Sequence, residues 1–250
     1  MEVHHHPNLN HKPKKWKEYF LEFLMIFLAV TMGFIAENIR ESISNSENEK
    51  VYMESLVQDI KDDIININTQ QSIFDKRIIL LDSLISMLNA RTITSNTSDL
   101  YYYARLATKS DAFLGNTRTF EQIKNTGGFR FIKNNKISES IMSYYSILDR
   151  IKQLEFAGGE DGEMNEYRKI AVEIFDANVF NRINSSSMNL VTRPVYNPPL
   201  RTSDIKKLGD LAGWVHYIKN TRIGIYQYKG DLLKKGETLI QQIQKEYHID

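Results

Sequence analysis

Apolar residues are distributed in two ways along the chain: one nearly unbroken run near the start, and helical stripes further on. The run covers residues 19–36, YFLEFLMIFLAVTMGFIA. A helix of this length rises roughly 27 Å at about 1.5 Å per residue, close to the roughly 30 Å hydrocarbon core of a bilayer. The run therefore predicts a transmembrane helix, which we place at residues 19–41.

Three interpretations of the run compete: a cleaved signal peptide, a buried core helix, and a signal-anchor that stays in the membrane. A cut after Ala36 would put Phe34 where signal peptidase requires a small residue. Glu22 leaves an uncharged stretch of only about fourteen residues, a length that also suits a buried helix. We favour the anchor because of the residues on either side of the run.

Those flanking residues also predict the orientation. Carboxylates dominate after the run, at Glu37 and Glu41, and the positive-inside rule then places the amino-terminal tail, residues 1–18, in the cytoplasm. The domain at 46–250 is accordingly expected in the periplasm, held by a single pass through a bacterial inner membrane. The basic and aromatic residues before the run are Lys12, Lys14, Lys15, Trp16, Lys17 and Tyr19.

Glu22, Gly33 and Glu37 are the candidate membrane or oligomer residues. Glu22 lies about one turn inside the predicted span, where its carboxylate can reach the interface, pair with Lys15 or Lys17, or face another copy of the helix. The sharper alternative is an ion or proton site within an oligomer.

After the anchor, Ser46 and Glu49 form an S-x-x-E capping box that predicts a new helix after a break at residues 44–46. Apolar positions then recur with a period near 3.5 for about five heptads, which predicts coiled-coil-like packing. Additional apolar residues widen this seam to a stripe typical of a helical bundle. We expect this stripe to contain more apolar surface than a single copy of the chain can bury. The seam consists of Met53, Leu56, Ile60, Ile64, Ile67, Phe74, Ile78, Leu81, Ile85 and Leu88, widened by Val57, Ile65, Ile73, Ile79, Leu80 and Leu84.

Four shorter helices are predicted. The first covers residues 100–112, and the second runs from a Thr119-x-x-Gln122 capping box to Gly127-Gly128. The third covers residues 136–157 after a cap at Asn135, and the fourth covers residues 163–178. Glu155 is placed on the polar side of its helix. Gly158 and Gly159 are expected to end that helix.

Residues 179–202 lack periodicity and contain three prolines, so they predict a long loop. Thr202 or Ser203 then caps a last long helix that runs to about residue 247 and contains five glycines. Close backbone contact, or a bend or break near residues 220–224, would account for them. The predicted fold is all-α: one transmembrane helix followed by an elongated bundle with two long helices.

Composition narrows the chemistry. The chain has 250 residues, a net charge of +1 and no cysteine. Near neutrality argues against a nucleic-acid partner, and the lack of thiols removes disulfides and Cys-ligated metals. The sequence contains no phosphate-binding glycine loop, dinucleotide fingerprint, G-x-S-x-G or H-E-x-x-H. We therefore predict no enzymatic activity and no cofactor.

The cluster His4, His5 and His6 is the candidate metal site, because imidazole nitrogens bind transition metals. A remnant of a purification tag and a flexible polar tail are the competing interpretations, and adventitious binding no tighter than micromolar is the expectation.

The acidic clusters are predicted to be structural. A solvated surface is predicted for Asp59, Asp62 and Asp63, and a helix start rather than a calcium loop for residues 160–163. The remaining aromatic set is predicted to be core, with a ligand pocket beside Arg105, Arg118 or Arg130 as the alternative; it comprises Tyr101, Tyr102, Tyr103, Phe120, Phe129, Phe131, Tyr144 and Tyr145.

Several segments carry a resemblance: the opening MEVHHHP, the basic KPKKWKEY, the anchor FLEFLMIFLAVTMGFIAENIRE and the later TFEQIKNTGGFRFIKN. Together they resemble an uncharacterised family of Bacteroidota single-pass membrane proteins. The resemblance implies a membrane location and native histidines, and no chemistry.

We expect a structural or scaffolding protein that is anchored in the lipid bilayer and assembles with itself or with subunits of an envelope complex. The alternatives are a periplasmic sensory module that passes a signal to a membrane partner, and a subunit of an oligomeric channel. The channel hypothesis depends on Glu22 alone.

Overall fold

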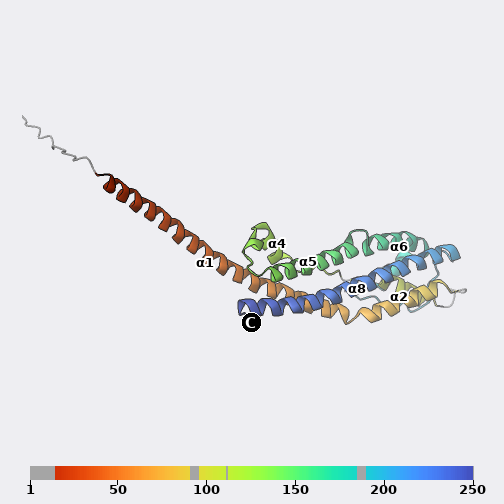
Figure 1. The fold of residues 1–250 in the computed structure, drawn as a ribbon. Helices are drawn as coiled ribbons and strands as arrows, with labels where there is room; N and C mark the ends of the chain where they lie inside the picture. Colours follow the sequence, from red (N-terminus) through yellow and green to blue (C-terminus); the bar gives the residue numbers. More distant parts are fainter. Residues whose placement is uncertain (1–14, 91–95, 111, 185–189, 250) are drawn as a thin grey trace, which may run out of the picture. The chain divides into compact units, whose positions relative to one another are not determined.

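The computed structural model describes residues 15–90, 96–110, 112–184 and 190–249, and divides into two compact units, residues 1–51 and 52–250. Regular structure in the described residues is helical, apart from one isolated antiparallel bridge between Asn184 and Val191 (Figure 1). The predicted all-α class is confirmed. The helices are α1 Trp16–Gln71, α2 Phe74–Leu88, α3 Thr97–Ala107, α4 Arg118–Asn125, η1 Gly128–Phe131, α5 Asn135–Phe156, α6 Glu160–Ile174, α7 Ala177–Ile183 and α8 Ile205–Tyr247.

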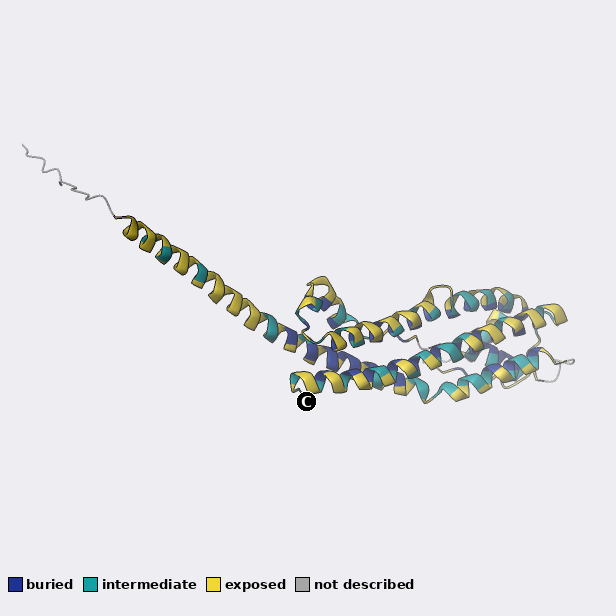
Figure 2. Cartoon of the chain, in the orientation of Figure 1, coloured by how far each residue is buried: buried dark blue, intermediate teal, exposed yellow. Residues whose placement is uncertain are grey.

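Helix α1 is long and apolar enough in its first part to cross a membrane, and none of its most apolar window is buried. Figure 2 shows this part of α1 almost entirely exposed. The break predicted at residues 44–46 is wrong, because α1 continues through them. Ser46 and Glu49 are interior helix residues, where the backbone N–H groups already have intrahelical partners and no capping box is required.

The first long helix predicted for the soluble part is interrupted. Helix α1 ends at Gln71, a polar residue between Ile67 and Phe74 of the apolar seam, and α2 begins at Phe74. The Phe74 ring stacks on Tyr226 of α8 with ring centroids 3.9 Å apart. The prediction of two long helices in this part is therefore met in part, by α8.

Most of the wide apolar seam is covered within one chain. Met53, Leu56 and Ile60 are fully buried, whereas Ile65 and Ile79 remain 66% and 64% exposed. The seam by itself therefore does not require a second copy.

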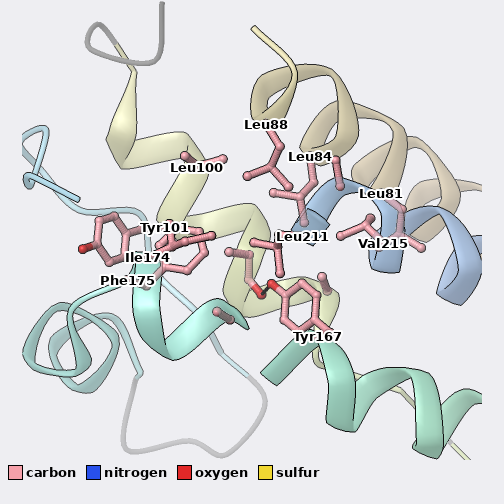
Figure 3. Packing of buried hydrophobic residues seen from close by; sticks show 14 of the residues in the cluster. Leu81, Leu84, Leu88, Leu100, Tyr101, Tyr167, Ile174, Phe175, Leu211 and Val215 are labelled. Atoms are coloured by element: carbon pink, nitrogen blue, oxygen red, sulfur yellow. Dashed lines mark hydrogen bonds between the residues drawn. The ribbon is translucent and has the colours of Figure 1, made fainter. Parts of the chain in front are cut away.

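The unit at residues 52–250 contains two apolar cores that share α8. The α5-side core is formed by α1, α4, α5 and the C-terminal part of α8, including Leu148 and Leu239. The α6-side core is formed by α2, α3, α6, α7 and the N-terminal part of α8, including Leu84 and Leu211 (Figure 3). Each core has its own set of short helices, and α8 is the element common to both.

Helices α5 and α6 are separated by a glycine pair, as predicted. Gly158 has φ +85°, a conformation that L side chains rarely adopt. A Cβ on Gly159 would lie 2.0 Å from the carbonyl oxygen of Leu154. The chain can therefore turn from one core to the other only with glycine at these two positions.

Helix α8 is continuous from Ile205 to Tyr247, so no break occurs near residues 220–224. A Cβ on Gly236 would lie 3.0 Å from Ile60 Cγ2 and 3.1 Å from Tyr144 Cε2. Close packing thus explains Gly236, while Gly224 has open space around it.

Several helix boundaries differ from the predictions. The caps are Asn134 for α5 and Asp204 for α8, each accepting a hydrogen bond from the backbone N–H two residues later. The helix predicted at residues 163–178 ends earlier, since α6 stops at Ile174, and residues 179–183 of the predicted loop belong to α7, which begins at Ala177 after an Asp176 cap. The described proline-rich residues that follow lie over α3 and α6, where Tyr101 donates to the carbonyl of Pro199.

Candidate functional site

Glu22, Gly33 and Glu37, the predicted membrane or oligomer residues, all lie on α1. At about 100° per residue they fall within about 60° of one another around the helix. Glu37 forms an ion pair with Arg40 at 2.5 Å. Apart from the adjoining residues and backbone of its own helix, no described atom lies within 4 Å of the position that a Cβ on Gly33 would occupy. The helix therefore has one face that carries both carboxylates and an open position between them.

The predicted metal ligands His4, His5 and His6 lie outside the described residues. Over the ranges that the structure describes, no group of three or more histidine, aspartate or glutamate side chains is placed to hold a metal ion.

Asp59 and Asp63 are buried, so the predicted solvated surface is wrong for both, whereas Asp62 is exposed. Asp59 Oδ2 accepts hydrogen bonds from the backbone N–H of Thr119 at 3.2 Å and from its hydroxyl at 2.7 Å. Asp59 Oδ1 pairs with Arg118 at 3.0 Å. The carboxylate on α1 thus satisfies an N–H in the first turn of α4.

This contact also corrects the predicted capping box of α4. The helix begins at Arg118, so Thr119 lies inside the first turn and its hydroxyl donates to Asp59 instead of capping. Sequence spacing identified a polar helix start, but the cap comes from a residue about sixty positions away.

Asp63 completes the same network. Its Oδ1 accepts from the backbone N–H and side-chain amide of Asn116 at 2.9 and 3.0 Å, and its Oδ2 accepts from the Tyr144 hydroxyl at 2.9 Å. Burial raises the pKa of Asp63 to about 6, and the nearby Asp59 acts in the same direction, while the hydrogen bonds from Asn116 and Tyr144 oppose the shift. With both oxygens engaged, Asp63 holds the segment before α4 against α1.

A second polar group, which we call the charged layer, lies between the two cores. It consists of the ion pairs Glu155–Lys229 and Glu160–Arg222, all four residues being buried. Along α8, Ile218 precedes the layer in the α6-side core and Leu232 follows it in the α5-side core.

Glu155 was predicted on the polar side of α5, and this is wrong. Its Oε1 lies 2.9 Å from Lys229 Nζ and its Oε2 accepts from the backbone N–H of Phe113 at 2.8 Å. Lys229 also donates to Gln70 Oε1 at 2.8 Å. Burial raises the pKa of Glu155, and the neighbouring ammonium opposes that shift.

Glu160 is the first residue of α6, as predicted for a helix start. Arg222 contacts its Oε1 through Nε at 3.0 Å and Nη2 at 2.8 Å, and donates to the carbonyl of Ala107 at 3.1 Å. Next to it, Glu163 Oε1 accepts from Thr221 at 2.8 Å, while Glu163 Oε2 is buried and has no hydrogen-bond partner among the described residues. Burial raises the pKa of Glu163.

Two small cavities border the charged layer, with volumes of about 60 and 80 Å³. Both are lined by Ser110, Glu155 and Glu160. Spaces of this size admit a few water molecules and are too small for an organic ligand. The charged layer therefore acts as a polar joint between the cores.

The larger opening is on the α6 side, and we call it the cationic cleft. Its volume is about 460 Å³, and its described lining includes no carboxylate. The floor is apolar and the rim carries the positive charges. The floor contains Ala104, Tyr167, Ala171, Phe175 and Phe180, and the rim Arg105, Lys109, Arg168 and Arg201.

The two arginines Arg105 and Arg201 have only neutral partners within the described residues. Arg105 donates to Asn184 Oδ1 at 2.8 Å and to the Thr108 hydroxyl at 3.2 Å. Arg201 donates to the carbonyl of Val172 at 2.5 Å. Arg168 lies 4.0 Å from Asp161, at the limit of an ion pair.

The prediction that the aromatic set is core is confirmed for its buried tyrosines, and the three arginines of the alternative pocket do not come together. Tyr101 and Tyr144 are core residues, Arg118 pairs with Asp59, and Arg130 stacks over Phe131 at 4.5 Å. Only Arg105 of the predicted arginines lines the cationic cleft. Arg168 and Arg201 line the same cleft, but they come from α6 and from the segment before α8. Their spacing in the sequence therefore does not indicate that they lie together with Arg105.

No protein-family model matches the chain, and no curated protein or solved structure is significantly similar to it.

Proposed function

We propose that this chain is an inner-membrane-anchored structural protein that holds a helical domain in the periplasm and assembles with itself or with envelope subunits. The observation that carries the proposal is the exposure of the whole apolar window of α1. A core helix of a soluble protein would cover such a surface, whereas lipid covers it in an anchor.

Contact between copies is assigned to the anchor, since the seam is mostly covered within one chain. Ala29 and Gly33 give α1 a small-xxx-small pair, which allows helices to approach closely in a bilayer. Glu22 and Glu37 lie on the same side of the helix, where another copy or a partner subunit would shield them from lipid.

Orientation is tested by fusing alkaline phosphatase, which is active only after export, behind Asp250. We expect an active fusion in membranes. A fluorescent protein that matures only in the cytosol should stay dark at the same position. Cytosolic fluorescence with inactive phosphatase would overturn the predicted topology.

Assembly is tested by light scattering of the full chain in an uncharged detergent. We expect a mass above one copy, and a lower mass for Gly33→Ile, because the larger side chain blocks close approach. Thr31→Ile, on nearly the opposite side of α1, is the matched control and should leave the mass unchanged. A clean monomer of the unmodified chain at micromolar concentration would count against self-assembly.

A second candidate function, a sensory module, is favoured by one observation, the cationic cleft. Occupation of the cleft by a ligand would stabilise the full chain against heat, because a ligand that binds only the folded state adds to its stability. The chain would then pass the signal to a membrane partner.

A further inference from the structure

We propose that the cationic cleft is a binding site for a small amphipathic carboxylate, an acid with an aromatic or aliphatic body. This inference goes beyond the structural role proposed above, and it would supply the ligand class of the sensory alternative.

The floor of the cleft suits the apolar body of such a ligand. Tyr167 and Phe175 project from α6 and its end toward α3, where Figure 3 shows Phe175 beside Tyr101. The Tyr167 hydroxyl donates to the carbonyl of Ala104 at 2.8 Å, so its polar tip is already satisfied, and the ring of this residue, which is 1% exposed, is part of the packed apolar lining. A volume of about 460 Å³ is within the range typical of small-molecule sites.

The rim suits the carboxylate. Guanidinium groups bind carboxylates through pairs of parallel hydrogen bonds, and such charge-assisted bonds are stronger than neutral ones. Arg105 and Arg201 each use part of their donor set on neutral oxygens and keep further N–H groups. A bound acid would supply the negative charge that their present partners lack.

The other charged groups near the cleft are already engaged. Asp176, which follows Phe175, accepts the N–H of Asn178 as the cap of α7. Asp161, whose side chain is 57% exposed, lies 4.0 Å from Arg168. Two arginines elsewhere in the described residues meet carboxylates: the buried Arg222 binds Glu160, and the exposed Arg118 binds the buried Asp59. In those two contacts a carboxylate neutralises the guanidinium, whereas Arg105 and Arg201 of the cleft contact neutral oxygens within the described residues.

The test uses the full chain in an uncharged maltoside detergent, with 2-naphthoate as the probe and 2-naphthylmethanol as its neutral counterpart. Titration calorimetry, corrected with empty micelles, should give saturable binding of naphthoate only. Arg105→Gln with Arg201→Gln should weaken Kd at least tenfold. Lys124→Gln with Arg130→Gln removes two charges on the α5 side and should leave Kd unchanged.

A further variant guards against misfolding. Val172 lines the cleft and is 60% exposed, so Val172→Glu adds a negative charge without removing a contact from the core. It should weaken naphthoate binding at least tenfold, whereas Val195→Glu, at a fully exposed position outside the lining, should not.

Three results would overturn the proposal: no naphthoate binding at millimolar concentration, equal binding of the neutral alcohol, or a Kd that is the same in the cleft variants and in the unmodified chain. None of these depends on orientation or copy number. Failure of this inference is therefore distinguishable from failure of the anchored structural role.

Discussion

The two halves of the helical unit treat charge differently. In the α5-side half, Asp59 and Asp63 are buried and every carboxylate oxygen meets a donor from the same chain. In the α6-side half, Arg105 and Arg201 line an open cleft and have neutral partners within the described residues. Internally balanced charge indicates a structural role, and unbalanced charge around an apolar floor indicates binding.

The charged layer between the halves follows the α5-side pattern. Glu155 meets Lys229 and a backbone N–H, and Glu160 meets Arg222. Burying ion pairs contributes little net stability, but removing one partner leaves a charge that neither water nor protein compensates. The layer is therefore the place where a single substitution should affect both halves.

The largest effect is expected for Lys229→Met. It leaves the Glu155 carboxylate buried with the Phe113 N–H as its remaining hydrogen-bond donor within the described residues, which should cost about 3–5 kcal/mol of unfolding free energy. Urea denaturation of the full chain in detergent at pH 7, followed by circular dichroism, measures this loss. The loss should shrink at low pH, because a protonated Glu155 carries no charge to bury.

The matched control is the double variant Lys229→Met with Glu155→Gln. A neutral amide oxygen can still accept from Phe113 without leaving a buried charge, so most of the stability should return. If the single and double variants were equally unstable, packing and not charge would explain the effect, and the contrast between the layer and the cleft would weaken.

The next effect is a pH dependence within the α5-side half. Asp63 has a folded pKa of about 6 against an ordinary value of 3.8. When folding raises the pKa of a carboxyl group, the contribution of that group to stability is fully present below its pKa in the unfolded chain. This contribution is lost as the pH rises through its pKa in the folded chain. Between about pH 4 and 6 the chain should therefore lose on the order of 3 kcal/mol through this group.

Asp63→Asn removes the titration while keeping an oxygen that accepts from Asn116. The free energies of unfolding of this variant and of the unmodified chain are compared by urea denaturation from pH 4 to 7. As the pH rises, the unmodified chain should lose stability relative to the variant. A difference independent of pH would show that Asp63 is ionised in the folded chain throughout this range.

Sequence periodicity predicted the helices better than their interruptions. The helices that became α5 and α8 and the glycine stop at residues 158–159 were identified correctly, because side-chain spacing and φ requirements are local properties. The break at residues 72–73 was missed, since Gln71 and Ser72 are individually compatible with a helix. The capping box at Ser46 was wrong because the same four residues also suit a helix interior.

The polar interior was beyond local reasoning. Asp59, Asp63 and Glu155 look like solvent-facing helix positions, and what buries them is a segment at residues 113–119 that docks across α1 and α5. The cationic cleft likewise combines residues from α3, α6, α7 and the segment before α8. Contacts between residues 42, 53 and 60 positions apart leave no spacing pattern in a single sequence.

Glycine substitutions compare the packing along α8. Gly236→Ala forces a Cβ to 3.0 Å from Ile60 and 3.1 Å from Tyr144, and should cost about 1–3 kcal/mol. Gly224→Ala, in the same helix with open space, should stabilise by about 0.5–1 kcal/mol through helix propensity. Thermal unfolding of both variants measures the contrast, and stabilisation by both would show that α8 does not pack closely on α1 at Gly236.

The smallest effect concerns a surface contact in the α6-side half. Lys219 on α8 pairs with Asp82 on α2 at 2.6 Å, and the Asp82 side chain is 53% exposed. Exposed pairs contribute about 0.2–1 kcal/mol, because water screens the attraction and ordering two side chains costs entropy. A double-mutant cycle with Lys219→Met and Asp82→Asn should give a coupling in that range that falls with added salt. A coupling as large as the one between Lys229 and Glu155 would mean that solvent exposure does not determine how much an ion pair of this chain contributes to stability. The distinction between the balanced charges of the interior and the unbalanced charges of the cationic cleft would then rest on geometry alone.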